Sequence, residues 1–362
     1  MTRNNHIDIA KGIGILFVVL GHNWIVNHDK TLIFQMIYSF HMPLFFLLGG
    51  VFLSTRQGVA DFARNKADAL LKPYLVVLLL LGVYRIGVGA TTPSQYFPGI
   101  LYGVGSTIDW VQLWFLPSLF ITLLFARLVL PLLQRTAFAS LNLAGLVVVL
   151  FLVGALLVDS YRDIPSADSP LLSWMFGPDA HLRGLPFSLD LLPLSAAFLL
   201  LGYLLREQIK QAVFQPLHLL AAIAVFVLAH LLFRYSTDLN LREYGHWLIT
   251  PLRALAGIYI VVSLSVLLTR YRVPAQTLAY LGRASLVILL FHAYVEWAIF
   301  GKLVNRFSEH PYAAGVAAFL GSLAISIGLY ELSRRVPPMA WLLLQSNQRS
   351  GALKTAPSEQ AA

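Results

Sequence analysis

Three ionisable residues, Asp8, Lys11 and His22, lie in the first apolar segment of this 362-residue chain. A charged side chain at the centre of a bilayer costs on the order of 3 kcal/mol on insertion scales, so it needs compensation. Eleven residues of helix turn through about 1100°, so Lys11 and His22 share one direction within roughly 20° and lie about 16 Å apart along the axis. Asp8 precedes Lys11 by three residues, a spacing that allows pairing. The spacing predicts one polar stripe from an ion pair to a deep imidazole.

A second histidine, His41, lies in the next apolar segment, in the run FHMPLFF at residues 40–46. Pro43 removes a backbone hydrogen bond and disturbs the preceding turn, which frees polar groups near His41. Two interpretations stay open. Either Asp8 and Lys11 anchor a helix end by snorkelling while the histidines satisfy local polar groups, or all these residues belong to one site. Two histidines on consecutive antiparallel spans favour a site.

The composition predicts an integral membrane protein. Hydrophobic residues make up 58% of the chain and charged residues 12%, which no ordinary water-soluble domain approaches. The net charge is +9, but the cations are scattered singly and form no face for nucleic acid. The chain has no cysteine, which excludes disulfides, thiolate metal sites and cysteine nucleophiles. No HExxH, GxSxG or phosphate-binding glycine motif is present, so neither a metal site nor a nucleic-acid partner is predicted.

Apolar stretches of about 20 residues, bounded by polar or Pro/Gly clusters, indicate transmembrane helices. About ten are present: 7–26, 32–53, 73–88, 113–133, 143–158, 189–205, 213–233, 249–268, 278–300 and 313–332. The predicted fold is an all-α, polytopic transmembrane helix bundle. Residues 1–344 form one membrane domain in this interpretation, and the polar, Ala/Ser-rich stretch 345–362 forms a disordered cytoplasmic tail.

The charges of the connecting segments predict an orientation. With ten spans, Lys and Arg gather on the side of the N-terminus, and most carboxylates gather on the other side. Positively charged loops stay in the cytoplasm, so both ends of the chain are predicted to lie inside. Asp8 and Lys11 would then lie near the cytoplasmic edge and His22 nearer the outside.

Several motifs together resemble the membrane acyltransferase-3 family. They are the pattern Asp8-x-x-Lys11-Gly12 followed by Gly21-His22, the run FHMPLFF at 40–46, LWFLP at 113–117, LLGYL at 200–204, and LGRxSL at 281–286 with Phe291-His292 after it. The resemblance extends from about residue 3 to residue 335 and is specific in its motifs.

The resemblance implies an acyltransferase of the bacterial inner membrane. Members of the family move an acyl group, usually acetyl from acetyl-CoA, to a hydroxyl of a cell-surface or exported carbohydrate. General similarity points to the xanthan-type exopolysaccharide acetyltransferases, whose acceptor is a polysaccharide or its lipid-linked precursor. The implied partners are membrane lipid, this saccharide and polysaccharide-assembly proteins.

The family pattern of a basic residue and a histidine separated by ten residues falls on Lys11 and His22. Many members have Arg at the first position. The Arg guanidinium can make two parallel hydrogen bonds to one ligand group, whereas the Lys ammonium is a single point charge. An imidazole suits the deprotonation of a hydroxyl because it titrates near neutrality. His22 is therefore predicted to be the general base, with Lys11, Asp8 and His41 in the same catalytic group.

Coenzyme A is polyanionic, and the basic residues before the third span are the candidates for its binding. The family's R-x-x-R pair aligns with Lys66 and Ala69, so its second cation is missing, and Lys72 beside Pro73 is the nearest substitute. Arg64, Lys66, Lys72 and Lys11 are predicted to contact the cofactor. The alternative is that these loops are basic for topology alone.

Trp114, His292 and Glu296 are candidates for contact with the acceptor. Each has a structural alternative: His292 and Glu296 stand four residues apart and can pair with each other, and Trp114 suits an interfacial aromatic belt. A transporter is the competing function, because intramembrane charge and proline-broken helices also mark substrate pathways. Inverted repeats would favour transport, and none is evident.

Overall fold

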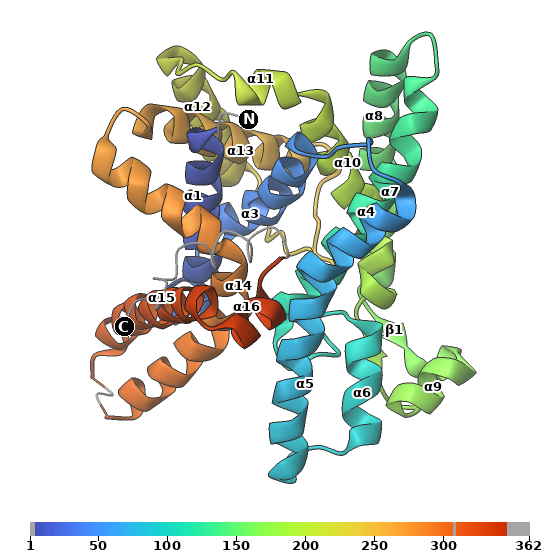
Figure 1. Cartoon of the computed structure of the whole chain (residues 1–362), viewed down its shortest axis with the longest axis vertical. Coiled ribbons are helices and arrows are strands. Elements are labelled where there is room, and N and C mark those ends of the chain that lie inside the picture. Colours follow the sequence, from blue (N-terminus) through green and yellow to red (C-terminus); the bar gives the residue numbers. More distant parts are fainter. Residues whose placement is uncertain (1–3, 307–308, 346–362) are drawn as a thin grey trace, which may run out of the picture.

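The computed structural model describes residues 4–306 and 309–345 (Figure 1). In order, its α-helices are α1 Asn5–His22, α2 Trp24–Asn27, α3 Leu32–Val51, α4 Val59–Lys66, α5 Lys72–Gly87, α6 Pro93–Tyr102, α7 Phe115–Gln134, α8 Ala139–Leu157, α9 Pro170–Phe176, α10 Leu192–Leu204, α11 Arg206–Lys210, α12 Pro216–Leu232, α13 Ile249–Leu268, α14 Arg272–Arg306, α15 Pro311–Arg335 and α16 Pro337–Leu343. The strands β1 (Ile164–Pro165) and β2 (His181–Leu182) form a small antiparallel pair. The predicted all-α polytopic bundle is confirmed.

Each of the ten predicted spans contains a helix, but eight helices of the described chain are long and apolar enough to cross a membrane. The two others are α1, which carries Asp8 and Lys11, and α12, which is apolar but has 17 residues. The predicted third span is the second half of a continuous helix over residues 59–87, in which a π-helical turn, Ala67–Leu71, joins α4 to α5. Of the predicted tail, only Gln345 lies within the described residues.

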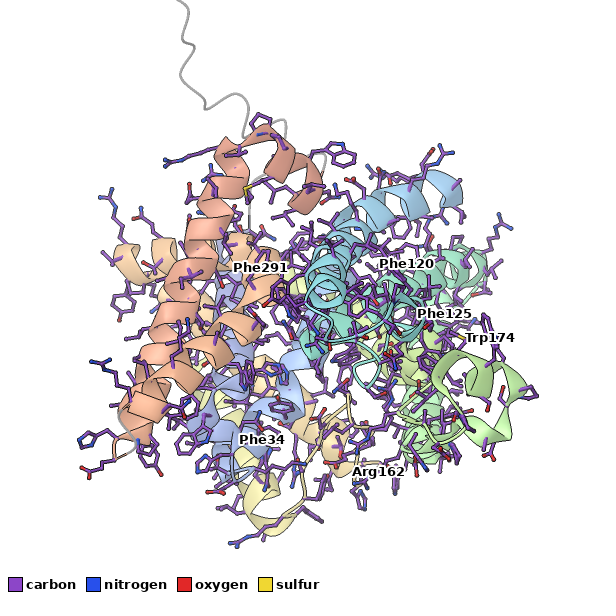
Figure 2. All side chains as sticks on the ribbon, turned by 90° about the horizontal axis from the view of Figure 1, so that it is seen from below. Phe34, Phe120, Phe125, Arg162, Trp174 and Phe291 are labelled. Carbon is purple, nitrogen blue, oxygen red and sulfur yellow. The ribbon has the colours of Figure 1, made fainter. Side chains whose placement is uncertain are left out.

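The surface of the bundle is apolar where lipid would surround it. Large exposed apolar side chains occur on several helices, among them Leu80, Val83, Leu156, Leu217 and Leu232. Such a surface is unfavourable in water and suits a hydrocarbon environment. In Figure 2, Trp174 of α9 lies at the rim of the molecule, whereas Phe291 of α14 lies in its interior.

α1 lies inside the bundle, against α3, α13 and α14. Its crossing with α14 is very close, because a Cβ atom on Gly12 would run into the carbonyl of Leu278, and one on Gly282 would run into the carbonyl of Asp8. Small residues permit this approach of two backbones in membrane helices. The polar residues of α1 therefore face protein, which is the compensation that their burial requires.

Candidate functional site

One face of α1 lines two cavities. Asp8, Lys11, Ile15 and Val18 line a cavity of about 420 Å³, which we call the lysine cavity. Val18 and His22 line a smaller one of about 40 Å³, which we call the histidine cavity. Steps of three and four residues keep these side chains on one helix face. The predicted stripe from Lys11 to His22 is confirmed, and the ion pair between Asp8 and Lys11 stays a prediction.

The lysine cavity combines cations with apolar walls. Lys11, Lys66 and Arg283 line it together with Asp8, and the Lys11 Nζ atom lies 5.3 Å from the centre of the Phe52 ring. The remaining walls come mainly from apolar residues of α3, α7 and α14: Met42, Phe45, Leu48, Phe115, Leu116, Leu119 and Leu286. A cavity of this kind suits an elongated ligand with an anionic end and an uncharged arm.

The histidine cavity brings both predicted intramembrane histidines together. His22 and His41 line it, with Tyr38 between them: the ring centre of Tyr38 lies 6.3 Å from that of His22 and 4.8 Å from that of His41. The wall also contains Gln112 and Trp114 from the segment before α7. At about 40 Å³ the cavity holds a group of a few atoms and not a whole sugar ring.

Backbone contacts fix the tautomers of His41 and His292, two of the buried histidines. His41 Nδ1 lies 2.8 Å from the carbonyl oxygen of Ile37, and His292 Nδ1 lies 2.8 Å from that of Ile288. A carbonyl only accepts, so Nδ1 donates and Nε2 of each neutral ring is left as an acceptor. The carbonyl that Pro43 deprives of its helical partner belongs to Ser39, four residues earlier. His41 therefore donates to the carbonyl of Ile37, and not to the carbonyl of Ser39 that the proline leaves without its helical partner.

The two cavities adjoin each other. Val18, Met42 and Leu289, from α1, α3 and α14, line both of them. From Lys11 to His22 the axial distance along α1 is about 16 Å. A ligand held by the cations of the lysine cavity therefore has a path toward the imidazole of His22.

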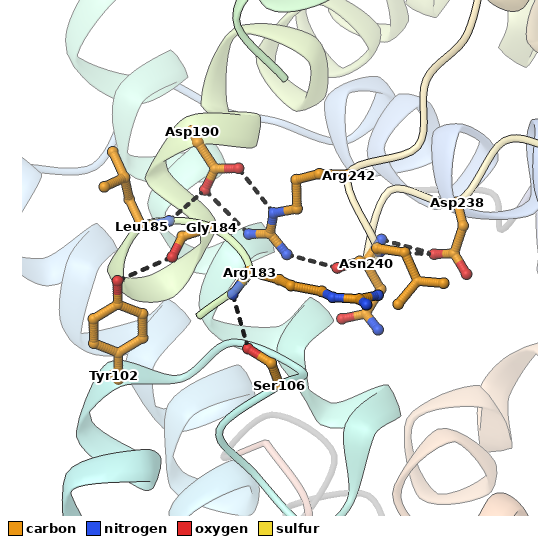
Figure 3. Close-up of polar contacts among 10 residues, drawn as sticks. Tyr102, Ser106, Arg183, Gly184, Leu185, Asp190, Asp238, Asn240 and Arg242 are labelled. Atoms are coloured by element: carbon orange, nitrogen blue, oxygen red, sulfur yellow. Dashed lines mark hydrogen bonds and ion pairs between the residues drawn. The ribbon is translucent and has the colours of Figure 1, made fainter. Parts of the chain in front are cut away.

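The loop between α12 and α13 contributes residues that sequence reasoning did not place in the site. Asp238, Leu239 and Asn240 line the histidine cavity. Asp238 Oδ1 accepts hydrogen bonds from the backbone N–H groups of Asn240 and Leu241, at 2.9 and 3.2 Å (Figure 3). Burial raises the pKa of the Asp238 carboxyl to about 6. The only local signal was an Asp and an Asn at turn spacing in a short loop between two spans.

Arg283 was also missed as a site residue. It belongs to the motif LGRxSL at 281–286, and the structure places it in the lining of the lysine cavity. The motif was the signal, but nothing in one sequence showed that this arginine lines the same cavity as Lys11 and Lys66.

Two of the predicted cofactor-binding residues lie elsewhere. Arg64 is exposed on α4 and lines neither cavity. The Lys72 ammonium pairs with Asp68 at 2.7 Å and donates to the carbonyl oxygen of Leu344 at 3.1 Å. Lys72 therefore fastens the end of α16 to α5, and Lys66 is the cation of this segment that faces the cavity.

The structural alternatives for Glu296 and Trp114, a pair with His292 and a place in an interfacial belt, differ from the observed contacts. Glu296 does not pair with His292: its carboxylate accepts a hydrogen bond from the Asn23 amide, and His292 donates to its own helix. A spacing of four residues on a helix permits a pair between Glu296 and His292. Each of the two side chains instead bonds the other group just named. Trp114 is 4% exposed and lines the histidine cavity, so it is not part of an interfacial belt.

His292 lies behind His22 and not in the cavity wall. Their ring centres are 5.3 Å apart, and His292 is fully buried. The structure thus brings Lys11, Asp8 and Lys66 together at the first cavity, and His22, His41 and Trp114 at the second. Glu296 is 3% exposed and lines neither.

A helix bundle with an apolar surface and two adjoining cavities that contain charged and polar side chains defines an integral membrane protein with a candidate site between its helices. The acyltransferase domain family matches residues 4–331, nearly the whole chain. The chain therefore belongs to the acyltransferase-3 family, and the protein is a multi-pass membrane acyltransferase. Comparison with curated proteins and with solved structures gives no match.

Proposed function

We propose that the protein transfers an acetyl group from acetyl-CoA to a hydroxyl of an exopolysaccharide or its lipid-linked precursor, in the bacterial inner membrane, with His22 as general base. The observation that carries the proposal is the junction of the two cavities along α1, at Val18, Met42 and Leu289. It provides one place for a large anionic donor and an adjoining place for a hydroxyl.

The lysine cavity is the proposed donor site. Lys11, Lys66 and Arg283 offer positive charge to the phosphates of coenzyme A, and the apolar walls offer surface to its uncharged arm. Lys11 lies about 16 Å from His22 along the helix axis, so its role is to hold the donor and not to exchange a proton with the base. Asp8 lines the same cavity, and its proposed role is to orient these cations.

The transfer itself takes place at the histidine cavity. The acceptor hydroxyl gives its proton to a nitrogen of His22 while its oxygen attacks the thioester carbonyl carbon. The tetrahedral oxyanion then collapses, the carbon–sulfur bond breaks, and the sulfur leaves with the electron pair and takes the proton from the imidazolium. His41 presents an unprotonated Nε2 when neutral, so it accepts a hydrogen bond from a hydroxyl in the cavity.

A membrane assay with labelled acetyl-CoA tests the proposal. Membranes that contain the wild-type protein should transfer the label to saccharide, and His22→Ala should reduce the rate by roughly 10²- to 10⁴-fold, the usual contribution of a general base. Asp179→Asn is a matched control, because Asp179 is exposed and lies outside both cavities. A normal rate of transfer by His22→Ala would show that His22 is not the general base. Saccharide that crosses the bilayer without label would instead support a transporter.

A further inference from the structure

The loop that follows α12 forms a closed turn over the histidine cavity. The backbone N–H of Asp238 donates to the carbonyl of Glu243 at 2.7 Å, and the N–H of Glu243 donates back to Asp238 at 2.9 Å. Asp238, Leu239 and Asn240, on one arm of this turn, line the cavity that contains His22. The turn therefore presents polar side chains to the proposed base.

A fully buried ion pair fixes this turn. The Arg242 guanidinium contacts both carboxylate oxygens of Asp190, at 2.9 and 3.1 Å, and it donates at 2.9 Å to the carbonyl oxygen of Asn240 (Figure 3). Both side chains of the pair are 0% exposed. Gly184 allows the guanidinium to lie against the backbone, since a Cβ atom there would overlap with it. Arg242 also has a φ of 58°, which only a strongly constrained non-glycine residue adopts.

Two residues of the cavity lining each have a buried polar atom without a partner. Within residues 4–306 and 309–345, neither Gln112 Nε2 nor Asn240 Oδ1 has a hydrogen bond, and the Gln112 side chain is 6% exposed. Both residues line the histidine cavity. Buried polar groups are normally satisfied, so an unmatched donor and an unmatched acceptor at one cavity indicate a ligand that supplies both functions.

The charges around the cavity disfavour an anionic ligand. Asp238 is the carboxylate in the lining, and the nearby guanidinium of Arg242 is already occupied by Asp190 and Asn240. An anionic ligand would therefore meet a carboxylate without a free cation in the cavity wall. A hydroxyl group donates and accepts, and it matches the amide nitrogen of Gln112 together with the oxygens of Asn240 and Asp238.

We propose that Gln112, Asp238 and Asn240 form the acceptor subsite, which recognises a neutral saccharide through the hydroxyls next to the one that is acylated. The Asp190–Arg242 ion pair is the positioning element that holds this subsite over His22. The inference rests on the proposed transfer to saccharide and names the groups that bind the acceptor. Because the cavity holds only a few atoms, the reacting hydroxyl and its neighbours enter while the rest of the saccharide stays outside.

The test uses the full-length protein in membrane vesicles, labelled acetyl-CoA, and the unacetylated saccharide isolated from producing cells that lack the gene. Initial rates are measured against each substrate for Gln112→Leu and Asn240→Ala. Each variant should raise the KM for saccharide at least tenfold and leave the KM for acetyl-CoA within twofold. The unchanged donor KM also reports that the variants are folded.

Arg162→Gln is the matched control. Arg162 is an exposed cation that pairs with Glu243 at 2.9 Å, next to Arg242, and it does not line the cavity. This variant should keep both KM values. An unchanged saccharide KM in Gln112→Leu and Asn240→Ala, or an equal rise in both KM values, would overturn the subsite. Absence of transfer by the wild-type protein would instead refute the proposed function.

Discussion

The ring of His292 on α14 lies 5.3 Å from the ring of His22 on α1, measured between their centres. His292 is itself held by the bond from its Nδ1 to the carbonyl oxygen of Ile288, at 2.8 Å. A fixed and fully buried ring therefore forms the support against which the proposed base is packed. Supporting residues of this kind act through the geometry of the group that they hold.

His292→Ala should therefore lower kcat by at least tenfold and leave the KM for acetyl-CoA unchanged, because the lysine cavity keeps its residues. His292→Phe restores a ring of similar shape and should recover part of the lost kcat. Steady-state kinetics against acetyl-CoA measures both effects. If His292→Ala keeps the wild-type kcat, the supporting role is wrong.

The proposed donor site predicts different effects on the KM for acetyl-CoA from two basic residues only two positions apart. Lys66 lines the lysine cavity, whereas Arg64 is exposed on α4. A hydrogen bond to a charged group is worth about 1.5–3 kcal/mol, so Lys66→Met should raise the KM for acetyl-CoA by roughly 10- to 100-fold. Arg64→Gln should leave it unchanged, and an equal rise in both variants would mean that only the total charge of the segment matters.

Helical periodicity was sufficient to predict the stripe on α1, because Lys11, Ile15, Val18 and His22 lie on one regular helix. Lys72 was named only as the nearest substitute for the family's second cation, by its place beside Pro73. That position does not show its observed partners, which are Asp68 at 2.7 Å and the carbonyl oxygen of Leu344, 272 positions later in the chain, at 3.1 Å.

The acceptor side of the site depends on contacts that no local pattern contains. Asp238 lines the same cavity as His22, and it lies in a loop whose Arg242 pairs with Asp190, a residue 52 positions earlier than Arg242. Gln112 lies in a short 3₁₀ segment before α7, where neither helix nor strand periodicity applies. Sequence reasoning named Lys11 and Lys66, which lie on helices and line the lysine cavity, and missed these residues of the connecting segments.

The close crossing of α1 and α14 gives a prediction for stability. A Cβ atom on Gly12 would overlap with the carbonyl of Leu278, whereas one on Gly145 of α8 meets nothing within 4 Å. Gly12→Ala should destabilise the protein by about 1–3 kcal/mol through overpacking, and Gly145→Ala should not. Thermal unfolding of the detergent-solubilised variants compares them. Equal melting temperatures would show that the two helices separate without cost.

The pKa of Asp238 predicts how stability depends on pH. Burial raises it from 3.8 to about 6, so between these pH values the folded protein binds more protons than the unfolded chain. Stability therefore falls as the pH rises through this window, and the loss is complete above about pH 6. Two pKa units correspond to about 3 kcal/mol. The repulsion from Glu243 adds to the shift, and Lys30 and the backbone N–H groups of Asn240 and Leu241 oppose it.

Asp238→Asn removes the titration and keeps an oxygen that accepts the backbone N–H groups of Asn240 and Leu241. The variant should be more stable than wild type by up to about 3 kcal/mol at pH 7.5, and the difference should vanish below about pH 4. Melting curves of the solubilised protein at several pH values measure this. Asp179→Asn, at an exposed position, provides the baseline. A loss of stability in Asp238→Asn at pH 7.5 would mean that the charged carboxylate has a stabilising partner in the histidine cavity.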